Sequence, residues 1–313
     1  MKAFVFPGQG SQTVGMGKDL ADAFAPAREV FQEVDDALGQ KLSKLIFEGP
    51  DTELNLTENT QPALLAVSMA VVRVLEQAKP GLITPARCKF VAGHSLGEYS
   101  ALTAAGTFSL ADAARLLKIR GQAMQKAVPV GVGAMAAILG LELPDVAAIV
   151  KEASGAEIVS AANDNSFGQV VVSGHKAAVE KAVALATAKG AKRAIILPVS
   201  APFHCALMQP AADTMNSALA EVHMNAPSVP LVANVIAEQV TDPARIRQLL
   251  VEQVTGMVRW RESVMYMKTQ GVTELIELGA GKVLNGLTKR IDAELTGRAV
   301  NAPKDIEEFA ATL

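Results

Sequence analysis

Residues 88–99 constrain this chain more than any other stretch. Residues 89–92 predict a short strand, the turn over 93–97 spells Gly-x-Ser-x-Gly, and a helix is predicted from Glu98 onward. In such a turn the serine sits at the carboxyl end of a strand, with its hydroxyl held out in solvent. The two glycines lack Cβ atoms, so the strand and the helix can approach each other closely. The stretch therefore predicts a nucleophilic serine, Ser95.

The composition argues against several classes of protein. Half of the 313 residues are hydrophobic, which is enough for a sizeable core, and the net charge of −3 argues against a nucleic-acid-binding surface. Cys88 and Cys205 form no CxxC pair or disulfide framework, and the four histidines lack metal-ligand spacing. No signal peptide or membrane span is predicted. We therefore expect a cytoplasmic protein with reduced cysteines and no metal.

The first part of the chain alternates apolar runs with helical patterns. Residues 3–6 predict a buried strand, which leads into a glycine-rich loop over 7–12. The loop does not fit the dinucleotide-binding pattern, because the third glycine would fall at Thr13. It is either an ordinary turn or a loop that lends a backbone N–H to the active site. Helices are predicted over 22–38 and 60–77, the second with a proline in its first turn.

The middle of the chain predicts a small inserted domain. Residues 128–133 form a plausible linker of valine, proline and glycine. The elements that follow are strand, helix, strand, strand, helix and strand, over 134–139, 144–153, 158–162, 169–173, 176–189 and 193–197, with a turn at 163–168. This is the order of a ferredoxin-like unit, whose ends lie close together as an insertion requires. We expect a small domain over 128–197 and a large domain from 1–127 and 198–313.

The rest of the chain returns to the earlier alternation of elements. Helices are predicted over 208–222 and 243–253, and strands over 229–234 and 273–278. The Gly-Lys pair that ends at Lys282 is not a phosphate-binding P-loop, because neither the first glycine nor the Ser/Thr of that motif is in place.

Arg120 is the most informative charged residue outside the serine turn. A helix is predicted from a cap at Ser109 to Met124, and the neighbours of Arg120 on it are apolar: Leu116, Leu117, Ala123 and Met124. A guanidinium on an apolar stripe must find an anion or reach water. Either a protein carboxylate pairs with it, or it waits for an acidic substrate that it would hold by two parallel hydrogen bonds.

His204 is the candidate base for the serine. A serine hydroxyl is a poor nucleophile until a base takes its proton. His204 lies in a proline-stiffened segment and follows the serine in the order typical of such enzymes. The oxyanion formed by attack needs fixed donors, and the N–H of Leu96 and one from the Gln9 loop could supply them. A backbone carbonyl, an amide or one of four aspartates could orient the histidine: Asp112, Asp145, Asp164 or Asp213.

Together these motifs resemble the malonyl-CoA:acyl carrier protein transacylases and, more widely, the acyltransferase domains of fatty acid and polyketide synthases. The resemblance extends almost end to end, and the residues that carry it are 6–12, 93–98, 120–121, 163–165, 203–205 and 279–284. It implies an α/β fold, with an α/β-hydrolase-like core, a parallel sheet and an inserted ferredoxin-like subdomain. It also implies ping-pong transfer of a malonyl group without a metal or a bound cofactor.

The resemblance implies roles for the residues that would carry out the chemistry. Ser95 would hold the acyl group as an ester, and His204 would be the base. The backbone N–H groups of Gln9 and Leu96 would form the oxyanion hole. The backbone carbonyl of Gln253 would hold the histidine.

The resemblance also implies the substrate and the partner. Arg120 would bind the free carboxylate of the malonyl group, and Asn165 and Phe203 are possible pocket residues. The partners would be malonyl-CoA and holo acyl carrier protein, with no nucleic acid and no membrane, and we expect a monomer. Carrier proteins of this family are acidic, so basic residues are candidates for docking: Lys189, Lys192, Arg193 and Lys282.

Two other functions stay open at this point. A serine hydrolase or thioesterase acting on acidic acyl thioesters would use the same serine and histidine, with water as the acceptor. Arg120 would select an acidic substrate for either enzyme and does not identify the acceptor. A non-catalytic binding protein is disfavoured, because Ser95, His204 and Arg120 are all present. The pathway that the reaction serves is not determined by the sequence.

Overall fold

A six-stranded sheet forms the larger part of the protein. The computed structural model describes residues 1–199 and 201–313. In spatial order the strands of this sheet are β10 (Thr296–Val300), β9 (Glu274–Leu278), β1 (Lys2–Phe6), β2 (Phe90–Gly93), β7 (Leu231–Val232) and β8 (Gln239–Val240). The first five strands are parallel, and β8 pairs with β7 antiparallel. Helical segments connect the parallel strands, as parallel pairing requires.

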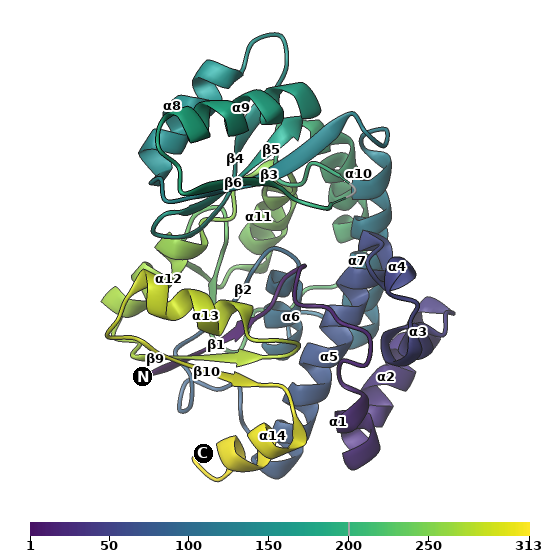
Figure 1. Ribbon diagram of the computed structural model, residues 1–313. Helices are drawn as coiled ribbons and strands as arrows, with labels where there is room; N and C mark the ends of the chain where they lie inside the picture. Colours follow the sequence, from purple (N-terminus) through teal and green to yellow (C-terminus); the bar gives the residue numbers. More distant parts are fainter. Residues whose placement is uncertain (200) are drawn as a thin grey trace.

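Helices surround this sheet (Figure 1). Along the chain they are α1 (Lys18–Ala23), α2 (Ala25–Leu38), α3 (Leu42–Glu48), α4 (Asp51–Leu54), α5 (Thr57–Ala78), α6 (Gly97–Ala104), α7 (Leu110–Lys126), the 3-10 turn η1 (Ala206–Met208), α10 (Gln209–Ala220), α11 (Pro243–Thr255), α12 (Trp260–Thr269), α13 (Val283–Ile291) and α14 (Pro303–Ala310). None of the helices in the described ranges has the length and apolar character needed to cross a bilayer.

The central strands β1 and β2 are buried on both faces of the large sheet, which explains their almost continuously apolar sequences. In β1, Ala3 and Val5 belong to a core shared with α12 and α13. Phe4 and Phe6, which point the opposite way, belong to the larger core shared with α5 and α7. The sheet is therefore enclosed between two helical layers, and the ends of its strands remain available for a site.

A second, four-stranded sheet lies above the first one in Figure 1. Its strands are antiparallel, in the order β4 (Val159–Ser166), β5 (Gln169–His175), β3 (Gly133–Leu139) and β6 (Arg193–Ile196). Two helices, α8 (Leu143–Ala153) and α9 (Lys176–Ala188), pack on one face. The predicted fold class, a parallel α/β core with a ferredoxin-like unit, is confirmed. The domain boundaries at 127/128 and 197/198 stay predictions, and residue 200 lies outside the described residues.

Two details of the first domain differ from the expectation. The helix predicted over 22–38 is interrupted, because Phe24 is extended with φ −127° and ψ 125°. The second helix begins at Thr57 rather than at residue 60, so Pro62 lies inside the helix and not in its first turn. The elements α3, α4, β8, α12, α13, β10 and α14 had no predicted counterpart.

The turn predicted over 163–168 is shorter than expected and occupies only residues 167–168, because β4 continues as far as Ser166. This polar stretch pairs with β5, and a partner outside the small sheet also holds it extended. The N–H of Asp164 donates to the carbonyl of Val258 at 2.9 Å, and the N–H of Val258 donates to the carbonyl of Ala162 at 2.9 Å. These two bonds also join the small sheet to the large part of the protein.

Candidate active site

Ser95 lies on the tight turn between β2 and α6. Its φ of 52° is in the left-handed region, which is uncommon for a residue other than glycine. The flanking glycines make the turn possible, since a Cβ on Gly93 would lie 1.9 Å from the carbonyl carbon of Gly97, and one on Gly97 would lie 2.3 Å from the oxygen of Phe6. The Ser95 N–H donates to Oδ1 of Asn234 at 2.8 Å. This bond helps to hold the serine in its strained backbone conformation.

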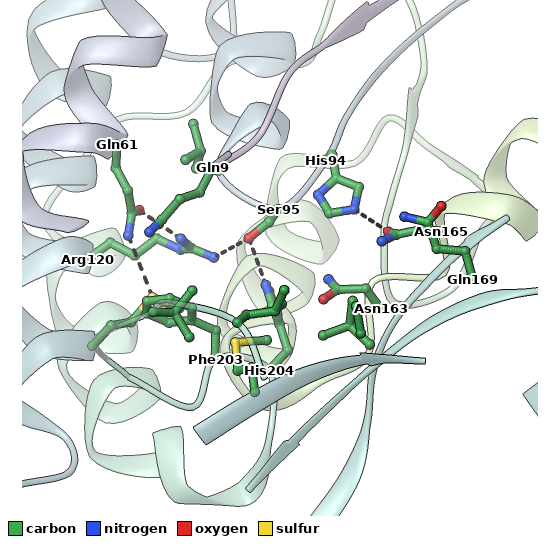
Figure 2. Close-up of a pocket in the computed structure, with 17 residues that line it drawn as sticks. Gln9, Gln61, His94, Ser95, Arg120, Asn163, Asn165, Gln169, Phe203 and His204 are labelled. Atoms are coloured by element: carbon green, nitrogen blue, oxygen red, sulfur yellow. Dashed lines mark hydrogen bonds between the residues drawn. The ribbon is translucent and has the colours of Figure 1, made fainter. Parts of the chain in front are cut away.

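His204 faces this serine across the pocket (Figure 2). Its Nε2 lies 2.7 Å from Oγ of Ser95, and its Nδ1 lies 2.9 Å from the carbonyl oxygen of Gln253 and 3.2 Å from that of Gly256. A carbonyl oxygen can only accept, so Nδ1 carries the proton and Nε2 presents its lone pair to the serine. Burial, and secondly the charge of Arg120, lower the pKa of His204 to about 3. The imidazole is therefore neutral at pH 7 and can take a proton.

None of the four aspartates considered from the sequence bonds to His204 within the described part of the chain. Asp164 pairs with Arg261 at 2.7 Å, Asp112 accepts from Ser109, and Asp213 accepts from Gln209. The fourth, Asp145, is in the first turn of α8. The hydrogen-bond acceptors of the histidine Nδ1 are the two backbone carbonyls instead.

Arg120 is 1% exposed and is held by neutral groups. Nη1 donates to Oε1 of Gln61 at 2.7 Å, and Nη2 donates to Oε1 of Gln253 at 2.8 Å and to Oγ of Ser95 at 3.2 Å. No carboxylate of the described residues lies within ion-pair distance, and Nε is buried without a partner. A buried cation with only neutral partners can accommodate an incoming carboxylate.

A pocket of ≈ 250 Å³ opens around these groups, between the two sheets. Gln9 and Leu96 line it, and their backbone N–H groups donate to no acceptor among the described residues. The Gln9 loop is anchored by its own side chain, whose Oε1 accepts from the Thr57 hydroxyl at 3.0 Å. Two free N–H groups beside a serine can hold an oxyanion.

The far wall of the pocket comes from the small sheet and the segment after it. Asn165 lies there, with Oδ1 2.8 Å from Nε2 of His94, and Phe203 also contributes to the wall (Figure 2). Burial lowers the pKa of His94. His94 and Gln61 were not predicted as site residues, although a buried amide on the apolar face of α5 is a signal that could have identified Gln61.

Two further polar residues were missed because their partners are distant in sequence. Glu98 is 1% exposed, and Asn234 is fully buried. Both accept hydrogen bonds from Nε2 of Gln253, at 2.6 Å and 3.3 Å. Burial raises the pKa of Glu98 to about 7.

A serine on a nucleophile elbow, paired with a neutral histidine, defines a serine enzyme that handles acyl groups. Comparison with known families and structures identifies the enzyme family to which the chain belongs. The model of the acyl transferase domain matches residues 3–291, and the chain belongs to that family.

Several relatives cover almost the whole chain. The malonyl CoA-acyl carrier protein transacylase of Escherichia coli K12 is 54% identical over 301 residues, 96% of each chain. The structure of an acyl-carrier-protein-S-malonyltransferase from Bartonella henselae is 56% identical and superposes with a TM-score of 0.97, over 99% of this chain and 98% of the other. A malonyl-transacylase solved in complex with its type II PKS acyl-carrier protein is 46% identical, with a TM-score of 0.95 over 100% and 99%. The resemblance stated from the motifs is confirmed.

Proposed function

We propose that this protein transfers a malonyl group from malonyl-CoA, through an ester on Ser95, to the phosphopantetheine thiol of an acyl carrier protein. The observation that carries the proposal is Arg120, a buried guanidinium with no carboxylate partner among the described residues, 3.2 Å from the serine Oγ. A group at that distance from the nucleophile is suited to bind the free carboxylate of the attached acyl group. The names of the relatives support malonyl as that group and a carrier protein as the acceptor.

In the first half-reaction, Ser95 Oγ attacks the thioester carbonyl while its proton passes to Nε2 of His204. The backbone N–H groups of Gln9 and Leu96 stabilise the oxyanion. The C–S bond then breaks, and the departing coenzyme A sulfur takes the proton from the imidazole. The second half-reaction is the reverse, with the thiol of the carrier protein giving its proton to His204 and attacking the ester carbonyl.

The substrate carboxylate also affects the base. The positive charge of Arg120 is the second cause that lowers the pKa of His204, after burial. A malonyl carboxylate beside Arg120 balances that charge, so the imidazolium formed during the reaction is less disfavoured. Acylation also frees the Nη2 hydrogen that Ser95 Oγ accepts in the free enzyme, and this hydrogen can then bond to the malonyl carboxylate.

The substrate path, the oligomeric state, the location and the docking residues are proposed together with this function. Asn165 and Phe203 would line the path of the substrate. A monomer is also proposed, and the free cysteines together with a coenzyme A substrate support a cytoplasmic enzyme. The four basic residues named above stay proposed for docking; of these, Lys189 already pairs with Glu152 at 2.9 Å.

Intact-mass measurement tests the function directly. The protein is incubated with malonyl-CoA and then with holo acyl carrier protein. We expect a malonyl adduct on the protein, then its disappearance as the carrier gains the same mass. Free malonate with an unloaded carrier would identify a hydrolase instead. Ser95→Ala is the control and should form no adduct; an adduct on this variant would exclude Ser95 as the nucleophile.

A further inference from the structure

The side chain of Gln253 connects the arginine of the site to a buried carboxyl group. Its Oε1 accepts from Arg120 Nη2 at 2.8 Å. Its Nε2 faces three acceptors: Oε2 of Glu98 at 2.6 Å, the carbonyl oxygen of Ser95 at 3.0 Å, and Oδ1 of Asn234 at 3.3 Å. The shortest of these contacts is the one to Glu98.

Only one orientation of this amide matches the hydrogen-bond donors and acceptors around it. Flipping it would turn the NH₂ group toward the Arg120 guanidinium, which is itself only a donor, and the oxygen toward three acceptors. The group that accepts most strongly from Nε2 therefore determines where Oε1 points. Oε1 in turn holds Nη2 of Arg120 next to the serine hydroxyl.

We propose that Glu98 is a positioning residue for substrate selection: by holding the side-chain amide of Gln253, it fixes Arg120 in the orientation that binds the carboxylate of the acyl group. This inference rests on the proposed function, since it assumes that Arg120 binds that carboxylate. It adds a residue that touches neither the substrate nor the reacting atoms.

The surroundings of Glu98 argue against a simpler structural role. Its side chain is buried on α6, forms no ion pair with a described residue, and leaves Oε1 without a partner. Oε2 accepts one other bond, from the N–H of Asn234 at a longer 3.3 Å. Burying such a group is unfavourable for stability. Its shortest hydrogen bond is to Nε2 of Gln253, whose Oε1 accepts from Arg120.

The test measures how fast each acyl-CoA loads the protein, by following coenzyme A release in the first half-reaction. The ratio of kcat/KM for malonyl-CoA to that for acetyl-CoA reports on Arg120, whether water or a thiol is the later acceptor. Glu98→Leu removes the acceptor from the amide of Gln253. We expect the ratio to fall at least about tenfold, through loss of malonyl activity. Glu98→Gln keeps an acceptor oxygen and should retain the ratio within about threefold.

A matched control separates positioning from stability. Glu277 is equally buried and accepts from the N–H groups of Leu284 and Asn285 at the start of α13. Glu277→Leu should lower the melting temperature and leave the ratio unchanged. If Glu98→Leu does not fold, Glu98→Asp withdraws the carboxylate by one methylene and should still lower the ratio by about threefold or more.

The results that test the role of Glu98 differ from the results that test the proposed function. Equal loss of malonyl and acetyl activity in Glu98→Leu and Glu98→Asp, or no change in either activity in these two variants, would overturn the positioning role. Failure of the wild type to load a carrier protein would overturn the transferase function. Even then, the ratio of kcat/KM for malonyl-CoA to that for acetyl-CoA could still be measured from coenzyme A release.

Discussion

Arg120 and His204 influence each other at the scale of single residues. One is a permanent cation and the other is the base, and both are buried beside the same serine. The arginine thus has two effects, since it attracts a substrate carboxylate and, without one, weakens the base. The two effects can be measured separately.

Replacing Arg120 by alanine should change substrate preference. We expect kcat/KM for malonyl-CoA to fall about 10²- to 10³-fold and that for acetyl-CoA to fall far less, because acetyl has no carboxylate to lose a charged partner. Arg115→Ala is the control, since Arg115 lies on the same helix with a 54% exposed side chain. A parallel fall with both substrates would refute the carboxylate role.

The same substitution should raise the pKa of His204. Burial remains, so the pKa should move from about 3 toward its ordinary value of 6.5 without reaching it. The imidazole Hε1 resonance, assigned by its loss in His204→Ala, follows this titration by NMR. An unchanged titration in Arg120→Ala would show that the charge of the arginine does not reach the base. Arg115→Ala should behave as the wild type.

At the scale of elements, the elbow depends on close approach of β1, β2 and α6. Gly97→Ala would place a methyl group 2.3 Å from the oxygen of Phe6, so we expect a loss of about 2 kcal/mol or more in the free energy of unfolding. Gly286→Ala on α13 is the matched control, because nothing lies within 4 Å of its added Cβ. It should stabilise the protein by about 0.5–1 kcal/mol. Chemical denaturation measures both, and a harmless Gly97→Ala would contradict the packing argument.

Local sequence patterns predicted the helices and strands that are determined by residues close together in the sequence. The strands that end at Phe6 and Gly93 are continuously apolar, and the ferredoxin-like unit alternates clear strands and helices, so both could be recognised. The extension of β4 to Ser166 could not, because its polar residues are held not only by β5 but also by Val258, about 95 residues later in the sequence.

Contacts between residues far apart in the sequence also limit how much of the site can be predicted. Ser95, Arg120 and His204 stand out by residue type in an unusual setting, and the structure brings them together, although their roles stay predictions. Glu98 and Asn234 look ordinary in the sequence. Their importance lies in contacts with Gln253, 155 and 19 residues away. No local pattern contains that information.

At the scale of the whole molecule, the site depends on how the two sheets are held together, because the pocket is lined by residues from both. Besides the backbone bonds to Val258, the connection includes an ion pair between Asp164 on β4 and Arg261 on α12, with an N–O distance of 2.7 Å. The Asp164 side chain is 1% exposed, and the Arg261 guanidinium also lies over the ring of Phe167, 4.9 Å from its centroid. This pair fixes the small sheet above the serine.

Breaking that ion pair should loosen the pocket and leave each sheet intact. For Asp164→Asn we expect about a tenfold fall in kcat/KM for malonyl-CoA and faster hydrogen exchange at the N–H groups of residues 164 and 258, because the partly buried guanidinium of Arg261 loses its charged partner. Glu152→Gln is the control. It breaks an exposed ion pair with Lys189 within the small unit and should change neither quantity. Exchange that also accelerates throughout β1 and β2 would mean that the variant destabilises the whole core, and the connection between the sheets would then not be a separate determinant of activity.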